Sequence, residues 1–260
     1  MKNPTAASHR LCRGPTAAIR GSLFALFLCA ACSALFAQAP SRYTLGTAAA
    51  DGLFPIGWSA EGKFAYVRAA ASSFRPDMVC RLVIQDLVTD KIVWDSGQRS
   101  MADLAESGKS LPKLNGEPLS AEYFFSYYYN ELSPQLAKYG IASFPKADLF
   151  QFPCAVNGYT LDAPVVVRSK TTDEDFGEAD VYKSFNFDLF MEHSALGKKK
   201  IFSENLANAY LFSVDSVGFF VSPFEKRAAV VLAYLRWGIE MEYSTDYRVV
   251  GSLYESGFSK

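Results

Sequence analysis

The feature that most constrains the fold of this chain is the alternation of apolar and polar side chains with a period of two residues. The clearest case runs from Val181 to Glu192, where the alternating apolar positions are Phe185, Phe187, Leu189 and Met191. Only Phe190 interrupts the polar face of this run. Such alternation is typical of a β-strand that is buried on one face. A polar corner over residues 193–197 and a second run beginning at Lys198 then predict a hairpin.

Further strands are predicted on both sides of this hairpin. Residues 228–235 (AAVVLAYL) are apolar on both faces, which indicates a central strand that is covered on both sides. Residues 247–253 alternate again and predict a closing strand. Earlier in the chain, residues 64–68, 79–87 and 91–94 are expected to form three successive antiparallel strands.

One segment predicts a helix. Ser120 is a suitable N-cap for a run whose apolar and aromatic side chains recur at three- and four-residue spacing, namely Tyr123, Phe124, Tyr127, Tyr128 and Leu132. Pro134 either kinks this helix or opens a second short turn. Gly140 is typical of a helix end.

Two segments repeat a pattern. Residues 57–67 (GWSAEGKFAYV) and 221–231 (VSPFEKRAAVV) each hold a strand end, a turn led by Ser with an acidic and a basic residue, and an apolar strand. Ser with Gly or Pro favours chain reversal, and we expect the charged tip to stay in water. The first segment resembles the W-S-x-D-G-K turn of TolB-type and WD40-like propeller blades, with Glu61 in place of Asp. Residues 81–91 resemble the third strand and last turn of such a blade.

The end of the chain, residues 218–258, is similar to a bacterial family described as predicted secreted proteins of unknown function. The resemblance rests on Ser222-Pro223 and on residues 236–240 (RWGIE), although the usual Gly of the turn is missing. No activity is assigned to that family, so the resemblance implies no catalytic residue.

Together these patterns predict a mainly-β fold of blade-like antiparallel sheets with one helical insert at about 118–140. About 220 residues could form one all-β domain or two small ones, and we assign residues 40–260 to a single extracytoplasmic domain. At about 40–45 residues per blade this length allows five blades, although two blade starts are visible. A partial propeller fits, and so does a smaller two-sheet body in which a strand near residues 42–45 pairs with the C-terminal strand.

Residues 1–39 have the marks of a signal peptide. Basic residues precede the uncharged stretch 21–37 (GSLFALFLCAACSALFA), which leads into the small-residue pattern A-x-A at 37–39. Cleavage is expected after this pattern or two residues earlier. Cys32 is a candidate lipidation site, and an uncleaved anchor is a further alternative. We therefore expect an extracytoplasmic protein, periplasmic or secreted, with a lipoprotein as one form.

The charge balance restricts the partners. Removing the four basic and no acidic residues of the signal segment leaves 22 basic and 27 acidic residues, a net charge of −5. Proteins that bind nucleic acid or anionic lipid present a basic surface instead. We therefore expect no nucleic acid partner, and contact with the membrane only through an uncleaved or lipidated N-terminus.

Side chains that carry chemistry are few after the signal segment. Cys80 and Cys154 could form a disulfide, while the alternative is that Cys80 is a buried thiol on the face of Leu82 and Ile84. His193 is the single remaining histidine, too few for the usual zinc ligand sets, and we expect it to be exposed at a hairpin corner. We identify no catalytic residue, no metal ligand and no cofactor.

The aromatic run over residues 124–129 covers more than one face of a helix. Its outer rings, Phe125 and Tyr129, either anchor a partner or are buried against a sheet, and we favour burial. Our first functional hypothesis is a non-catalytic periplasmic binding or scaffold protein for another envelope protein, with four candidate contacts: Phe125, Tyr129, Trp58 and Trp237. The alternative is a carboxylate-dependent hydrolase of the cell envelope, which needs two carboxylates about 5–9 Å apart in a cleft.

Overall fold

The computed structural model describes residues 52–71, 78–100, 124–125, 127–143, 149–156, 158–172, 181–237 and 243–259. The contacts divide the chain into two units, Met1–Ala37 and Gln38–Lys260, and the described residues all belong to the second. The predicted signal peptide with Cys32, the predicted strand near residues 42–45 and the predicted cap Ser120 lie outside the described residues. In the described part of the chain, no helix combines the length and apolarity needed to cross a membrane.

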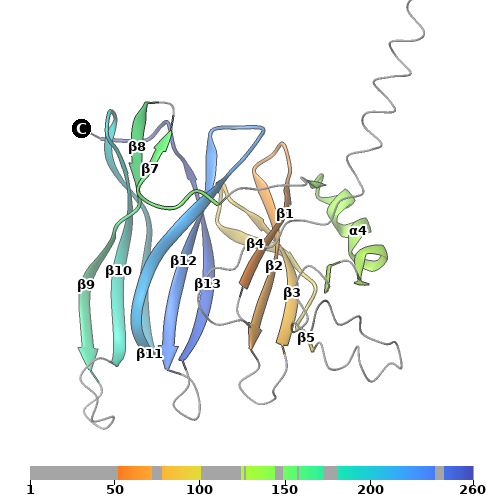
Figure 1. Cartoon of the computed structure of the whole chain (residues 1–260), viewed down its shortest axis with the longest axis horizontal. Coiled ribbons are helices and arrows are strands. Elements are labelled where there is room, and N and C mark those ends of the chain that lie inside the picture. The colour runs from red at the N-terminus through yellow and green to blue at the C-terminus, as the bar shows by residue number, and fades with distance from the viewer. Residues whose placement is uncertain are drawn as a thin grey trace, which may run out of the picture. The chain divides into compact units, whose positions relative to one another are not determined.

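Two antiparallel sheets make up most of the described unit (Figure 1). Sheet A runs in the order β4-β3-β2-β1-β6, with β5 also beside β3. Its strands are β1 (Gly52–Trp58), β2 (Lys63–Ala71), β3 (Met78–Asp86), β4 (Lys91–Asp95), β5 (Arg99–Ser100) and β6 (Ala142–Ser143). Sheet B runs in the order β13-β12-β11-β10-β8-β7, with β9 also beside β10. Its strands are β7 (Cys154–Val156), β8 (Tyr159–Asp162), β9 (Val165–Thr172), β10 (Tyr182–His193), β11 (Gly197–Val221), β12 (Arg227–Trp237) and β13 (Tyr243–Leu253). The mainly-β prediction is confirmed.

The strands predicted from the period-two pattern are present. The alternating run 181–192 forms β10, whose side chains alternate between buried and half-buried, and its hairpin partner is β11. The predicted central strand is β12, which pairs with β11 on one side and β13 on the other. Its first six residues are buried, because sheet A covers one face of β12 and the inside of sheet B covers the other.

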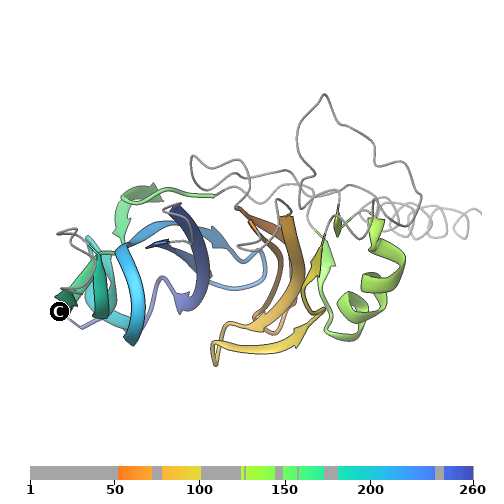
Figure 2. The same ribbon diagram turned by 90° about the horizontal axis from the view of Figure 1, so that it is seen from below.

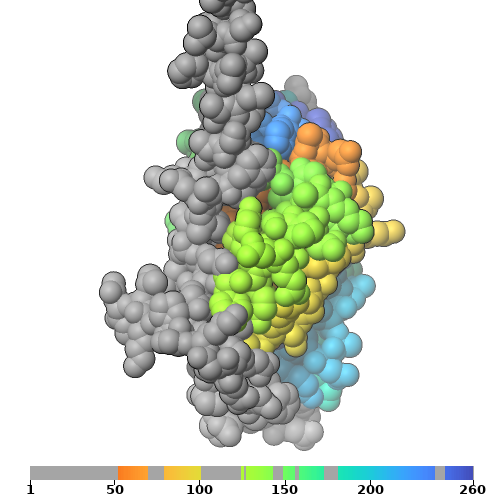
Figure 3. All heavy atoms as spheres, turned by 90° about the vertical axis from the view of Figure 1, so that its right-hand side faces the viewer, coloured from red at the N-terminus to blue at the C-terminus, as the bar shows by residue number. Residues whose placement is uncertain are grey.

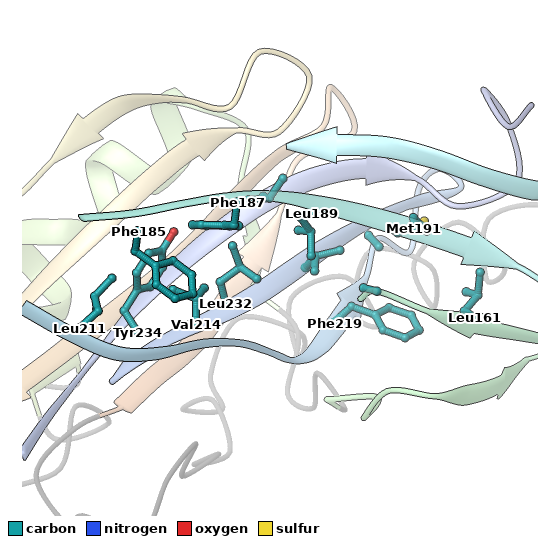
Figure 4. Close-up of a cluster of buried hydrophobic side chains, with 14 of the residues drawn as sticks. Leu161, Phe185, Phe187, Leu189, Met191, Leu211, Val214, Phe219, Leu232 and Tyr234 are labelled. Carbon is teal, nitrogen blue, oxygen red and sulfur yellow. The ribbon is translucent and has the colours of Figure 1, made fainter. Parts of the chain in front are cut away.

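Sheet B is strongly curled because β11 is shared between two hairpins (Figure 2). The first part of this 25-residue strand pairs with β10, and its last part pairs with β12. Between the two parts, Asn208 and Tyr210 have positive φ angles of 52° and 46°, and the register with β10 shifts. A bulge of this kind bends a strand and increases its twist. Side chains from β10, β11 and β12 therefore meet and fill the inside of the curl (Figure 4).

Three layers of apolar side chains hold the unit together. The first lies between sheet A and the helix α4 (Tyr129–Lys138), which covers one face of that sheet (Figure 3), and includes Ile56, Val67, Leu82, Phe124 and Leu136. The second lies between sheets A and B and includes Trp58, Phe64, Tyr66, Phe220 and Val231. The third fills the inside of sheet B and includes Phe187, Leu189, Met191, Phe219 and Leu232.

The two sheets are stacked so that equivalent faces point in the same direction. Each Ser-led turn ends at a basic residue, and the first and third residues after this basic residue point away from α4. In β2 these residues are Phe64 and Tyr66, and in β12 they are Ala228 and Val230. The second and fourth residues point toward α4 in both strands. In both sheets, therefore, the equivalent face points away from α4. The two faces that meet between sheets A and B are not equivalent.

The helix α4 lies within the predicted insert 118–140. Leu132 and Leu136 are its buried residues and pack on sheet A. Pro134 stands inside α4, so it does not begin a separate turn. The helix ends before Gly140, which has a φ of 66°, and the N–H of Ile141 donates to the carbonyl oxygen of Leu136 at 2.9 Å. A glycine in the left-handed region with such a bond is a common helix end, as the sequence predicts here.

Candidate functional site

The four aromatic residues predicted as partner contacts have different surroundings. Phe125 and Trp58 are core residues, with exposed fractions of 3% and 2%. Tyr129 is 37% exposed, and its ring meets that of Phe125 edge-on with 5.7 Å between centroids. Trp237 is half-buried, and its ring centroid lies 5.5 Å from that of Phe212. These four side chains therefore do not form one surface.

Cys80 and Cys154 are not joined by a disulfide in the part of the chain that the structure describes. Cys80 is fully buried between sheet A and α4, in the same cluster as Leu82 and Ile84. Cys154 packs at the rim of the cluster inside sheet B. The two thiols thus belong to different core layers on opposite sides of sheet A, so the disulfide considered from the sequence is not formed.

His193 is buried, with 5% of its surface exposed, and the prediction of an exposed corner residue is wrong. Its ring stacks on Tyr159 at 4.0 Å and meets Phe258 edge-on at 5.5 Å between centroids. Its Nδ1 accepts the backbone N–H groups of Ala195 and Leu196 at 3.1 and 3.2 Å. His193 therefore holds the β10–β11 corner in shape, and its Nδ1 is occupied by the turn.

Lys199 on β11 fastens the end of the chain to the same corner. Its ammonium donates hydrogen bonds to the carbonyl oxygens of Leu253 and of Ser256, the latter at 2.7 Å. It also lies over the ring of Phe258, 4.5 Å from the centroid. Burial, together with the positive charge of Arg227, lowers the pKa of Lys199 from 10.5 to about 8.

This pKa shift predicts a pH dependence of stability. Between pH 8 and pH 10.5 the folded protein binds fewer protons at Lys199 than the unfolded chain does, so stability rises with pH in this window. We expect the free energy of unfolding of the wild type, relative to Lys199→Met, to increase from about pH 8 to about pH 10.5. Urea denaturation of both proteins across this range measures it. A difference that stays constant or falls would contradict the prediction.

A polar cleft of about 310 Å³ opens between sheets A and B. Its charged side chains are four arginines and three carboxylates, namely Arg68, Arg81, Arg236, Arg248, Asp90, Glu204 and Asp246. A guanidinium carries five N–H donors and no acceptor, so arginines in a confined space pair readily with carboxylates. The cleft is therefore a place where charged groups of the two sheets neutralise one another.

Two of the cleft carboxylates are held by direct partners. Asp246 on β13 forms an ion pair with Arg68 on β2, which links sheet B to sheet A. Glu204 on β11 accepts the hydroxyl of Tyr234 at 2.6 Å and also pairs with Arg248. Burial, together with the hydrogen bond to Glu204, raises the pKa of the Tyr234 hydroxyl. The hydroxyl therefore stays protonated and remains a donor to the carboxylate.

The third carboxylate, Asp90, and the neighbouring Gln85 close the edge of β13. Among the described strands β13 has one neighbour, β12, so half of its backbone groups face away from that ladder. The N–H of Gly251 donates to Asp90 at 2.6 Å, and the carbonyl oxygen of Val249 accepts from Gln85 Nε2 at 3.0 Å. Burial raises the pKa of Asp90, and this effect outweighs the hydrogen bond from Gly251, which lowers the pKa. Tyr66 donates its hydroxyl to Gln85 at 3.0 Å, and burial raises the pKa of Tyr66 to about 12.

The two Ser-led turns meet at one end of the stacked sheets. In each turn the Ser hydroxyl oxygen accepts the N–H of the residue two positions later, at 3.2 Å. Gly62 in the first turn has a φ of 80°, and a Cβ there would lie 2.8 Å from Glu225 Oε1 of the second turn. The same Cβ would lie 3.2 Å from Val88 Cγ2, in the turn between β3 and β4. Three turns therefore converge at Gly62.

Arg227 joins these converging turns. It is 9% exposed, its Nη1 donates to the carbonyl oxygen of Leu87 at 3.0 Å, and its Nε donates to Glu225 Oε1 at 2.6 Å. The expectation that the charged tips stay in water is therefore wrong for Arg227. It is right for Glu61 of the first turn, whose side chain is 78% exposed. The sequence holds one signal for the burial of Arg227. Arg rather than Lys ends the second turn, and its planar group can bridge two acceptors.

Large apolar side chains are exposed around Arg227. Val88 is 61% exposed, Phe224 48% and Leu253 36%. Val88 follows Leu87 and Phe224 precedes Glu225, and Arg227 binds both Leu87 and Glu225. Leu253 is paired with Arg227 itself across β12 and β13. We call these three residues the turn patch. Sequence reasoning missed it, because single apolar residues in turns carry no periodic signal.

No protein-family model matches this chain, and neither a curated protein nor a solved structure matches it. Its function is therefore inferred from the geometry of these residues.

Proposed function

We propose that this chain is a non-catalytic extracytoplasmic protein, periplasmic or secreted, that binds another envelope protein through the turn patch. The observation that carries the proposal is the exposure of Val88 and Phe224 on turns that Arg227 holds in place, and of Leu253 beside Arg227 at the end of β13. Clustered exposed apolar groups are typical of protein interaction sites. Because the turns are ordered before contact, little conformational entropy is lost when a partner docks.

The sequence supports this location and architecture. The basic and then uncharged segment within residues 1–39 is typical of export, and lipidation at Cys32 would tether the protein to a membrane. The Ser-led turns and the stacking of the two sheets with equivalent faces in the same direction support a relation to propeller blades. Neighbouring blades present their turns on a common face, and this arrangement suits a scaffold.

The cleft favours a structural role over catalysis. Its carboxylates interact with arginine, tyrosine and backbone groups, and the Arg68–Asp246 pair and the bond from Gly251 to Asp90 link the two sheets. A glycosidase needs one carboxyl group free to give a proton and a second free to receive one or to attack. The alternative, a carboxylate-dependent hydrolase of the cell envelope, is favoured by one observation: Asp90 lines the cleft and has a raised pKa.

Site-specific photo-crosslinking in the native envelope tests the proposal. A benzophenone amino acid at position 224 is expected to give one predominant adduct with an envelope protein, and Val88→Ser with Leu253→Ser should abolish the adduct. Position 129 is the matched control, because Tyr129 is an exposed aromatic residue on α4, outside the turn patch, and should give none.

The proposal would be contradicted by the absence of any adduct at position 224, or by an adduct there that survives the loss of Val88 and Leu253. It would also be contradicted if the purified protein hydrolysed envelope polymers and Asp90→Asn abolished this hydrolysis, a result that would establish the hydrolase instead.

A further inference from the structure

We propose a second binding site of a different kind, in which the edge strand β9 accepts an extended segment of a partner chain as an additional strand of sheet B. β9 has eight residues and pairs with β10 alone among the described strands. An edge strand leaves alternate backbone N–H and C=O groups without a ladder partner, and these groups can template another strand. Every residue of β9 after Val165 is exposed, so the edge is accessible along its length.

A groove of about 500 Å³ lies beside the inner face of β9. From β9 it is lined by Val165, Val167 and Lys170, which pair with Leu189, Phe187 and Phe185 of β10 and therefore share the inner face of the curl. Phe212 and Val214 of β11 contribute apolar surface from the other side. A strand added to β9 would continue the curl, and its inward side chains would enter this groove. Apolar side chains at alternate positions fit such a groove.

The opposite wall already pairs with a piece of chain in the same way. Phe150, outside the named strands, exchanges two backbone hydrogen bonds with Phe219 of β11, at 3.0 and 2.9 Å. It lies on the side of β11 away from β12, and Gly218 admits it, because a Cβ at position 218 would lie 2.5 Å from the carbonyl oxygen of Phe150. The groove residues 212–216 precede this bridge on the same strand. Both walls therefore offer backbone groups, which favours a peptide strand over a lipid chain.

The charges of β9 define the partner further. Its two charged residues are both basic. Arg168 is held on the outer face by Asp188 at 3.2 Å and Asn205 at 2.6 Å, whereas Lys170 lines the groove over the ring of Tyr182. Asp215 on the opposite wall already accepts the Ser213 hydroxyl at 2.8 Å. The fitting partner is therefore an extended segment with alternating apolar residues and one carboxylate that meets Lys170.

Fluorescence anisotropy with labelled eight-residue peptides and the full chain tests the proposal. The peptides carry valine at alternate positions and one glutamate, in both orders along the strand. We expect binding that Val167→Arg weakens by at least about tenfold, equivalent to about 1.4 kcal/mol. Val166→Arg is the matched control, because Val166 and Val167 are 40% and 43% exposed but Val166 lies on the outer face, so it should weaken binding by less than about twofold. Methylation of alternate peptide nitrogens should abolish binding, since it removes the donors that pair with β9.

Several results would overturn the proposal. These are the absence of binding by every peptide, equal effects of the two arginine variants, or undiminished binding of the methylated peptide. A fluorescent fatty acid that binds in a Val167-dependent way while the peptides do not would make the groove a lipid site. A Val167-dependent dimer in place of peptide binding would assign the edge to a second copy of the chain. Val88→Ser with Phe224→Ser should leave peptide binding unchanged, which separates this site from the turn patch.

Discussion

Replacing Gly251 with alanine is expected to lower the free energy of unfolding by at least about 3 kcal/mol. A Cβ at position 251 would lie 2.0 Å from the carbonyl oxygen and 2.6 Å from the Cβ of Leu87. These atoms cannot retreat freely, because Arg227 binds that carbonyl oxygen and Asp90 binds the N–H of Gly251. The added methyl group would therefore push sheet A away from β13. Urea denaturation followed by tryptophan fluorescence, to which Trp58 between the sheets contributes, measures the loss.

Gly97→Ala provides the control for this substitution. Gly97 has a φ of 75°, and no heavy atom lies within 4 Å of the position that a Cβ would take there. Alanine at this position therefore carries the backbone cost without the clash, about 1–2 kcal/mol. If Gly251→Ala does not accumulate in soluble form while Gly97→Ala does, the ordering still holds. Equal stability of the two variants would contradict the close packing of β13 on the β3–β4 turn.

Replacing Arg227 with methionine is expected to lower the free energy of unfolding by about 2–4 kcal/mol. Methionine replaces the aliphatic part of arginine but has no donor, so the carbonyl oxygen of Leu87 and the carboxylate of Glu225 would both lose their partner. The Glu225 side chain is 30% exposed and can turn to water, so the main source of the cost is the buried carbonyl oxygen left without a donor. Arg227→Lys keeps the charge but cannot reach both acceptors with one planar group. The stability of this variant should therefore lie between those of the wild type and Arg227→Met.

The first Ser-led turn supplies the comparison for Arg227. Lys63 ends that turn as Arg227 ends the second. Its side chain is 19% exposed, whereas that of its partner Glu61 is 78% exposed. The Glu61 carboxylate stays in water when the pair is lost, and a pair with such an exposed member contributes about 0–1 kcal/mol, so Lys63→Met should change stability by no more than that. Similar losses for Arg227→Met and Lys63→Met, measured by urea denaturation, would show that Arg227 does not hold the turns together.

The fold could be predicted far better than the candidate sites. The alternating run that forms β10 specifies its buried face locally, and Gly140 marks the end of α4 through its own backbone freedom. His193 shows the limit of such reasoning. Its place at a hairpin corner was predictable, but its burial comes from Tyr159 and Phe258, which are distant in sequence.

The turn patch and the β9 edge show the same limit. Val88 and Phe224 occur singly in turns, and a single apolar residue has no period from which its exposure could be predicted. β9 carries three consecutive valines, which indicate a strand but do not indicate that one edge of this strand lacks a partner among the described strands. Which edges remain open depends on how far β11 bends at Asn208 and Tyr210, and neither residue type announces a bulge.

The sequence by itself determined the strands with a clear apolar pattern, such as β2, β3, β10 and β12, the helical insert and the two Ser-led turns, because these depend on side chains a few residues apart. Only the tertiary structure decided that Arg227 is buried, that β13 is closed by sheet A and that β9 is open. These outcomes depend on contacts such as Arg227 with Leu87 and Gln85 with Val249, which are separated by 140 and 164 residues. Local alternation specifies which face of a strand avoids water, but the partner that covers that face is chosen by packing across the whole domain.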